Sequence, residues 1–107
     1  MSEKILYPNE TEFNALLQEN GVVFVDFFAT WCGPCKMLGP ELEKLAEAYE
    51  GSAKVVKIDV DKEQGLAMKY QVQSVPTIMI FKNNELVLRD AGFKPYPVLV
   101  ETLKKYL

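Results

Sequence analysis

Apolar residues along the chain alternate between strand-like runs and helix-like stripes. Residues 22–29 read Val-Val-Phe-Val-Asp-Phe-Phe-Ala, which is apolar on both alternating faces and predicts a central strand covered by helices on each side. A short apolar segment at residues 4–7 predicts an edge strand, and the β-branched run at residues 55–60 predicts a third strand. Between the first two strands, residues 11–19 carry apolar side chains at helical spacing and end before Asn20-Gly21, a helix stop signal.

A stronger helical pattern follows the central strand. Residues 35–50 place apolar side chains in one stripe, and Gly51 follows as a candidate C-cap. Pro40 lies inside this stripe, where it removes a backbone donor, and it predicts a kink near Gly39. Residues 63–70 predict a short, weakly patterned helix. The order of strand, helix, strand, helix and strand implies parallel pairing with right-handed crossovers.

The last third of the chain breaks this alternation. Residues 77–81 and 86–88 are strand-like and flank Lys82-Asn83-Asn84-Glu85, which reads as a hairpin turn because Asn tolerates positive φ. Pro95 and Pro97 then stand where a final helix would begin, and apolar residues at helical spacing follow them. We therefore expect an α/β fold with a mixed sheet and helices on both faces.

Length, charge and the amino-terminal residues narrow the class of protein. A chain of 107 residues and 12.2 kDa predicts a single domain over residues 1–107. Its 12 Lys and Arg against 15 Asp and Glu give a net charge of −3, so we expect no nucleic-acid partner. Residues 1–8 lack the apolar core of a signal peptide, and no stretch approaches the roughly 20 apolar residues of a membrane helix. We expect a cytoplasmic protein without a membrane partner.

The chain has no histidine and only two cysteines, Cys32 and Cys35. The lack of imidazole excludes Ser-His-Asp and Cys-His hydrolase sites and histidine-ligated metals. Two thiolates alone make a site for zinc or an iron-sulfur cluster improbable in a single chain, so we expect no metal and no cofactor.

The two cysteines are the strongest chemical signal. They form a Cys-Gly-Pro-Cys sequence between the central strand and the second helix, the arrangement of a redox motif in a βαβ unit. At the exposed helix N-terminus, unpaired N–H groups and the helix dipole favour a thiolate at Cys32, so it should attack. Cys35, in the first turn and less accessible, suits a resolving thiol. A purely structural disulfide is disfavoured, because closing a loop of about 4 residues stabilises by only about 1.9 kcal/mol.

Asp26 is a carboxylate in the middle of the apolar central strand, where burial opposes ionisation. The strand leads directly to Cys32, so Asp26 is expected to lie beneath the cysteines and to exchange a proton with Cys35. The alternative interpretations are a solvated edge residue or a structural ion pair. Lys57, on the neighbouring strand, is either the partner of Asp26 or a residue that faces water.

Two further features lie near this motif. Pro76 in Val75-Pro76-Thr77 is either an ordinary proline at the start of a strand or part of a cis peptide at the rim of the site. Trp31, beside the nucleophile, is more plausibly a contact surface than a core residue.

Over essentially its full length, the chain resembles the thioredoxin family. The residues that carry the resemblance are Val25-Asp26-Phe27, Trp31-Cys32-Gly33-Pro34-Cys35-Lys36, Pro40, Lys57, Val75-Pro76-Thr77 and Ala91-Gly92. The resemblance implies a thioredoxin fold with a five-stranded mixed central sheet flanked by four helices. It also implies a cis Pro76 and a thiol-disulfide oxidoreductase that reduces protein disulfides and is itself reduced by a thioredoxin reductase, usually an NADPH-dependent flavoprotein.

The family pattern also assigns roles to individual residues. Cys32 attacks, Cys35 resolves, and Asp26 with Lys57 assists proton transfer. The substrate-binding residues that it implies are Trp31, Gly33, Pro34, Val75, Pro76, Gly92 and Phe93. The expected partners are disulfide-containing proteins and the reductase, with the chain itself a monomer.

The sequence departs from the family pattern at several positions. Phe28 stands where a second Trp is usual, so we expect the indole bond to an acidic residue near Asp61 to be missing. Asn84 replaces a turn Gly, Ser74 stands where Gly is frequent, and Lys94-Pro95-Tyr96-Pro97 is an unusual entry to the last helix.

Two other functions are compatible with the sequence. One is a redox-silent binding module with spectator cysteines, and the other is a metal-bridged dimer that shares two Cys-x-x-Cys pairs.

Overall fold

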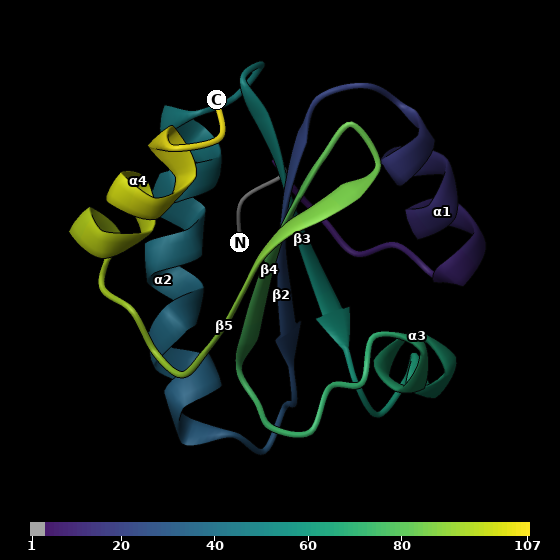
Figure 1. Cartoon of the computed structure of the whole chain (residues 1–107). Helices are drawn as coiled ribbons and strands as arrows, with labels where there is room; N and C mark the ends of the chain where they lie inside the picture. Colours follow the sequence, from purple (N-terminus) through teal and green to yellow (C-terminus); the bar gives the residue numbers. More distant parts are fainter. Residues whose placement is uncertain (1–3) are drawn as a thin grey trace.

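The computed structural model describes residues 4–107, which form one five-stranded sheet and four helices (Figure 1). In chain order the elements are β1 (Ile5–Leu6), α1 (Glu10–Gln18), β2 (Val22–Phe28), α2 (Gly33–Ala48), β3 (Ala53–Asp59), α3 (Gln64–Lys69), β4 (Thr77–Lys82), β5 (Glu85–Ala91) and α4 (Tyr96–Lys104). Every predicted strand and helix is present, and the thioredoxin fold expected from the resemblance is confirmed.

The sheet is mixed, as predicted, with β2 at its centre. The strand order is β1-β3-β2-β4-β5. β3 pairs in parallel with both β1 and β2, whereas β4 runs antiparallel to β2 and to β5. The parallel half and the antiparallel half therefore meet at β2, the strand that leads into the cysteine motif.

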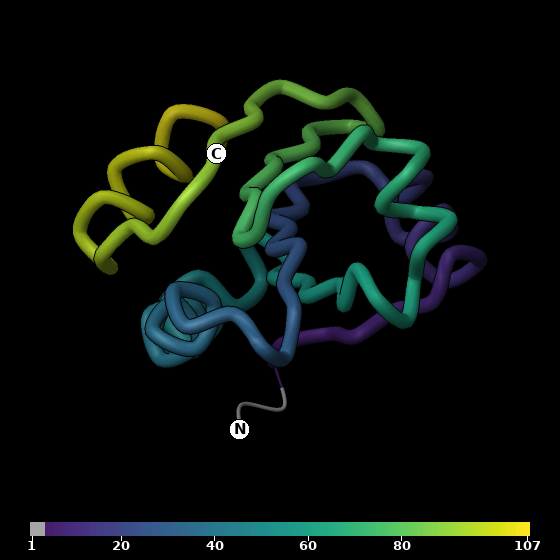
Figure 2. Tube along the Cα trace, turned by 90° about the horizontal axis from the view of Figure 1, so that it is seen from below, coloured from purple at the N-terminus to yellow at the C-terminus, as the bar shows by residue number. Residues whose placement is uncertain are grey.

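Helices cover both faces of the sheet, which explains why β2 is apolar on both sides. Figures 1 and 2 show α2 and α4 on one face and α1 and α3 on the other. Under α2 and α4, Val22 and Phe24 of β2 pack with Leu38 and Leu42. Under α1 and α3, Val23, Val25 and Phe27 pack with Phe13 and Leu66. Alternate β2 residues thus belong to two separate cores.

Local signals explain where the elements begin and end. Asn9 and Glu12 form a capping box that starts α1, with Glu12 N–H donating to Asn9 Oδ1 at 2.9 Å. α2 begins at Gly33, two residues before the predicted Cys35, because Pro34 in the first turn is already preorganised for a helix. Asn83 and Asn84 have φ values of 51° and 68°, which confirms that the hairpin turn uses the left-handed tolerance of Asn.

The proline-rich entry to α4 is supported from another helix. Pro95 is the N-cap and provides no side-chain acceptor. Instead, the Glu41 carboxylate of α2 accepts the Tyr96 N–H at 3.0 Å, and this bond holds the pKa of Glu41 below its usual value. α4 is thereby tied to α2 at its first turn.

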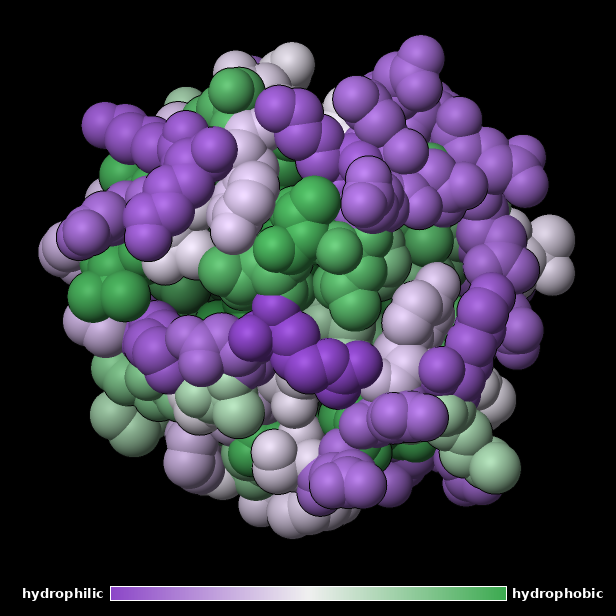
Figure 3. Space-filling view, in the orientation of Figure 1, coloured by the Kyte–Doolittle hydropathy of each residue, from purple (hydrophilic) through white to green (hydrophobic). Residues whose placement is uncertain are grey.

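The surface seen in Figure 3 has an apolar area near its centre, where β5 crosses the molecule, and hydrophilic side chains border it. Leu86 of β5 is among the exposed apolar residues. In residues 4–107 no helix is long and apolar enough to cross a membrane.

Candidate active site

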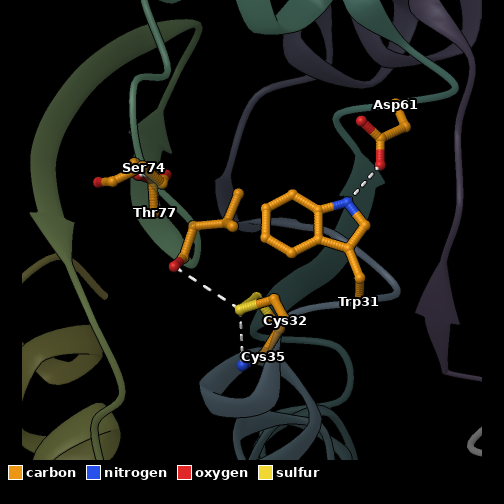
Figure 4. The surroundings of a disulfide bond; sticks show 7 residues. Trp31, Cys32, Cys35, Asp61, Ser74 and Thr77 are labelled. Atoms are coloured by element: carbon orange, nitrogen blue, oxygen red, sulfur yellow. Dashed lines mark hydrogen bonds between the residues drawn. A yellow bond between two sulfur atoms is a disulfide. The ribbon is translucent and has the colours of Figure 1, made fainter.

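The cysteine pair lies at the carboxyl end of β2, where the loop enters α2. Cys32 is the N-cap of α2 and forms a disulfide with Cys35 across a Cα–Cα distance of 5.2 Å. The Cys35 N–H donates to Cys32 Sγ at 3.2 Å (Figure 4). The Cys32 sulfur therefore occupies the place of a capping side chain, where the unpaired N–H groups and the dipole of α2 favour negative charge.

The structure corrects one expectation about exposure. The sequence predicts an accessible Cys32 and a hidden Cys35, yet in the disulfide their exposed fractions are 5% and 3%. Both belong to a small cluster with Ala29, against which Phe28 and Val75 also pack. Their helix positions, rather than overall exposure, distinguish the two sulfurs in this state.

A second segment reaches the cysteines from the antiparallel half of the sheet. The Val75–Pro76 peptide is cis, which confirms the implied isomer. It places the Val75 carbonyl oxygen 3.7 Å from Cys32 Sγ (Figure 4). Two bonds fix this segment: Thr77 Oγ1 donates to the Ser74 carbonyl at 2.7 Å, and the Gly92 N–H donates to the Pro76 carbonyl at 2.9 Å.

Trp31 forms part of the surface beside the disulfide, as predicted, with an exposed fraction of 69%. Its Nε1–H donates to Asp61 Oδ2 at 2.9 Å (Figure 4). Phe28 has no indole N–H to donate, as expected, but Asp61 still accepts from an indole because Trp31 supplies the donor. Sequence reasoning identified Asp61 only as an acidic position and missed its role in holding Trp31.

Asp26 is completely buried, with an exposed fraction of 0%. Neither carboxylate oxygen has a hydrogen-bond partner. Burial raises the pKa of Asp26 to about 7, and the positive charge of Lys57 opposes that rise. The alternative of a solvated edge residue is wrong, because Asp26 pairs with strands on both sides.

Lys57 lies directly opposite Asp26 in the parallel β2–β3 pairing. It is half-buried, and its Nζ lies 4.6 Å from the centroid of the Phe28 ring. Since the Asp26 oxygens have no bonded partner, Lys57 acts on Asp26 through its charge without forming a direct ion pair.

Comparisons with known proteins agree with this geometry. The family model described as Thioredoxin matches residues 4–105. The chain belongs to the thioredoxin family. A thioredoxin of Staphylococcus epidermidis is 47% identical over 96% of this chain and 98% of its own length, and one of Staphylococcus aureus is 52% identical over 83% and 86%. A solved structure of a mutant thioredoxin from Halobacterium salinarum superposes with a TM-score of 0.89 at 41% identity, covering 96% of this chain and 90% of the other.

Family membership and the intact cysteine pair establish the chemistry. The protein is a thiol-disulfide oxidoreductase that reduces protein disulfides through Cys32 and Cys35, and a reductase regenerates its dithiol. Within residues 4–107, no group of three or more His, Cys, Asp or Glu is placed to hold a metal ion.

The structure brings several of the predicted substrate-binding residues together and separates one from them. Trp31 and Val75 line one surface pocket, and Gly92 is joined to Pro76 by a backbone bond. Gly33 and Pro34 are exposed in the first turn of α2. Phe93, in contrast, is partly buried and packs against the core under α2 and α4.

The same pocket contains residues that the sequence did not single out. Val60, Val72 and Gln73 line it, together with Ser74, which the sequence marks only as a departure from the family pattern. No motif marks Val60 or Val72, and only their placement beside Trp31 in the fold reveals them.

Proposed function

We propose that this protein works in the cytoplasm as a monomeric reductant in which Cys32 attacks and Cys35 resolves, with Asp26 and Lys57 assisting proton transfer. The main support for these roles is the position of Cys32 Sγ at the N-cap of α2, where it accepts a hydrogen bond from the Cys35 N–H. After reduction, the same position stabilises a thiolate at Cys32 in preference to one at Cys35.

The proposed exchange has two steps. The Cys32 thiolate attacks one sulfur of a substrate disulfide, forms a mixed disulfide and releases the other substrate sulfur as a thiolate. Cys35 then loses its proton and attacks Cys32 Sγ, which breaks the mixed disulfide and releases the second substrate thiolate. Two electrons pass from the dithiol to the substrate, and the Cys32–Cys35 disulfide remains.

Asp26 is the proposed acceptor of the Cys35 proton. With a pKa of about 7, Asp26 is present in both protonation states near neutral pH. Its burial and its two unpartnered oxygens leave the carboxylate free to accept a proton, directly or through water. Lys57 opposes the effect of burial and keeps the ionised form accessible.

The proposed substrate surface surrounds the cysteines. Trp31 and the pocket that it shares with Val75 offer apolar contact to a substrate segment. Gly33, Pro34, Pro76 and Gly92 border the same end of the sheet and complete this surface. Pro76 is buried and Phe93 is partly buried against the core, so these two are less accessible than Trp31, Gly33 and Pro34.

The proposed partners follow from the charge as well as from the family. Disulfide-containing proteins and a thioredoxin reductase are the expected partners. A net charge of −3, with 12 basic and 15 acidic residues, supports the absence of a nucleic-acid partner.

The deciding measurement is the reduction potential of the Cys32–Cys35 pair, titrated against a dithiol buffer and followed by thiol alkylation. A value of about −270 mV, the general value for thioredoxin, would support a cytoplasmic reductant. A value between about −120 and −180 mV would indicate an oxidant or isomerase and would overturn the proposed compartment.

The individual cysteine roles need a separate test. Cys35→Ser should accumulate a mixed disulfide with a substrate protein through Cys32, whereas Cys32→Ser should not. Replacement of both cysteines by Ser distinguishes a reductase from a binding module, because only a module would keep its cellular role. Trapping through Cys35 in the Cys32→Ser variant would reverse the assignment.

A further inference from the structure

Asp26, Phe28 and Lys57 occupy adjacent positions on the face of the sheet that packs against α2. Asp26 pairs with Lys57, and Phe28 pairs with Asp59 one step further along the same two strands. Residues two apart on a strand point to the same face. Phe28 is therefore the diagonal neighbour of Lys57.

The Lys57 ammonium lies between the Phe28 ring and α2. Its Nζ is 4.6 Å from the ring centroid, within the range of a cation–π contact. On the other side, a Cβ added to Gly39 of α2 would lie 4.0 Å from Nζ. No ion pair joins Lys57 to a carboxylate among residues 4–107. Among the described residues, the Phe28 ring is thus the direct contact of this ammonium, which also interacts through its charge with Asp26.

A surface cleft offers the ammonium a second position. The residues that line it are Tyr7, Pro8, Phe28, Thr30, Lys57, Asp59, Lys62 and Glu63. A lysine side chain has a flexible four-carbon stem and a strongly hydrated head, so without a contact it extends towards water and nearby carboxylates. Asp59 and Glu63 provide such carboxylates in the cleft. The Phe28 ring competes with this outward position.

We propose that Phe28 is a positioning residue whose ring face holds the Lys57 ammonium at the inner end of the cleft, where its charge acts on Asp26. This inference deepens the proposed roles of Asp26 and Lys57 and rests on them for its functional meaning. Phe28 also packs against the cluster that contains Cys32 and Cys35, but the proposed effect on Asp26 is exerted through Lys57.

Other charged groups near Asp26 do not replace this effect. Burial raises the pKa of Tyr7, and the negative charges of Glu43 of α2 and of Asp26 add to the rise. Asp59, Lys62 and Glu63 line the cleft, whereas the residue opposite Asp26 on β4 is the apolar Ile78. Lys57 is the only group whose charge is resolved as acting on Asp26 among the described residues.

The test measures the pKa of Asp26 in the oxidised protein from the ¹³C shift of its carboxyl carbon. We compare the effect of Phe28→Leu in the natural background and in a Lys57→Met background. Leu also admits water to the carboxyl group, but that effect is common to both backgrounds and cancels in the comparison. Phe28→Leu should raise the Asp26 pKa more when Lys57 is present than in the Lys57→Met background. The difference between the two changes should be a few tenths of a pH unit.

Phe28→Tyr serves as the matched control, because it keeps the ring face and should leave the Asp26 pKa unchanged. An equal effect of Phe28→Leu in both backgrounds, or a relative fall, overturns the proposal. If Phe28→Leu does not fold, the Phe28→Trp variant replaces it, and its stronger ring contact should lower the Asp26 pKa only when Lys57 is present. The proposed function fails separately, when Asp26→Asn leaves the rate of disulfide exchange unchanged at every pH.

Discussion

At the scale of single residues, Asp26 makes stability depend on pH. Its pKa of about 7 lies above the value of 3.8 for a free side chain, because burial opposes the charge. Between these two values the folded protein binds more protons than the unfolded chain, so the free energy of unfolding falls as the pH rises. This contribution to the free energy of unfolding is fully lost above the pKa of Asp26 in the folded protein. It amounts to a few kcal/mol, at about 1.4 kcal/mol for each pH unit between the folded and unfolded pKa values.

Asp26→Asn should remove this dependence. The neutral amide cannot ionise, so the free energy of unfolding should stay nearly constant between pH 5 and pH 8, where the natural protein becomes less stable. Urea unfolding of both oxidised proteins at several pH values measures the difference. A stability gap between the two proteins that does not change with pH would contradict the cause given for the shift.

Residues differ in how far the sequence reveals their surroundings. Burial of Asp26 was predictable, because a single carboxylate interrupts an apolar strand. The bond from Trp31 to Asp61 joins positions 30 residues apart and depends on where the β3–α3 loop lies. Lys57 faces both the protein and a cleft, so its sequence position alone left two orientations open.

Asp61→Ala should loosen Trp31 without unfolding the protein. Both side chains are exposed, so the free energy of unfolding should change by less than about 1 kcal/mol. Trp31 is the single tryptophan, and its fluorescence anisotropy should fall as the indole loses its acceptor. Asp61→Asn keeps an acceptor oxygen and should largely preserve the anisotropy. Equal anisotropy in all three proteins would show that the bond does not hold the ring.

At the scale of elements, Arg89 of β5 supports the segment that leads to the cis peptide. Its guanidinium donates to the carbonyls of Tyr70 and Gln71, just after α3, and Gln71 has a φ of 54°. These bonds satisfy carbonyls that the end of a helix leaves unpaired. β5 thereby fixes the start of the connection between α3 and β4.

Arg89→Met should release this connection. Met keeps much of the apolar stem but loses both donors, so amide hydrogen exchange should become faster at residues 71–75 and stay unchanged in β2. Arg89→Lys, which retains a single cationic donor, should show an intermediate effect. Unchanged exchange at residues 71–75 in Arg89→Met would indicate that Thr77 and Gly92 suffice to hold the segment.

The elements themselves were more predictable than their ends. The two-sided apolar run of β2 and the Asn turn each depend on local chemistry, and both match the structure. β5 extends from Glu85 to Ala91, beyond the predicted residues 86–88, because sheet pairing includes polar residues that carry no strand pattern. The entry to α4 depends on Glu41, which lies 55 positions away.

At the scale of the whole molecule, the site lies where the two halves of the sheet meet. The parallel half supplies the cysteines through β2, and the antiparallel half supplies the Val75 carbonyl through the connection to β4. The alternation of elements predicted this mixed topology. The residues left a place for Val75 at the rim of the site as one of two interpretations, and the family resemblance favoured it, since no local pattern joins positions 43 residues apart.

This arrangement predicts that the fold depends little on its disulfide. The bond closes a loop of a few residues between Cys32 and Cys35, whereas cores on both faces of the sheet hold the molecule together. Restricting so short a loop stabilises the oxidised protein by only about 1.9 kcal/mol. Urea unfolding with and without a reductant should therefore show that both forms are folded and that their free energies of unfolding differ by about 2 kcal/mol. In the double variant Cys32→Ser/Cys35→Ser, the reductant should not change the free energy of unfolding. If the natural protein unfolds on reduction, the pair is a structural disulfide that the fold requires.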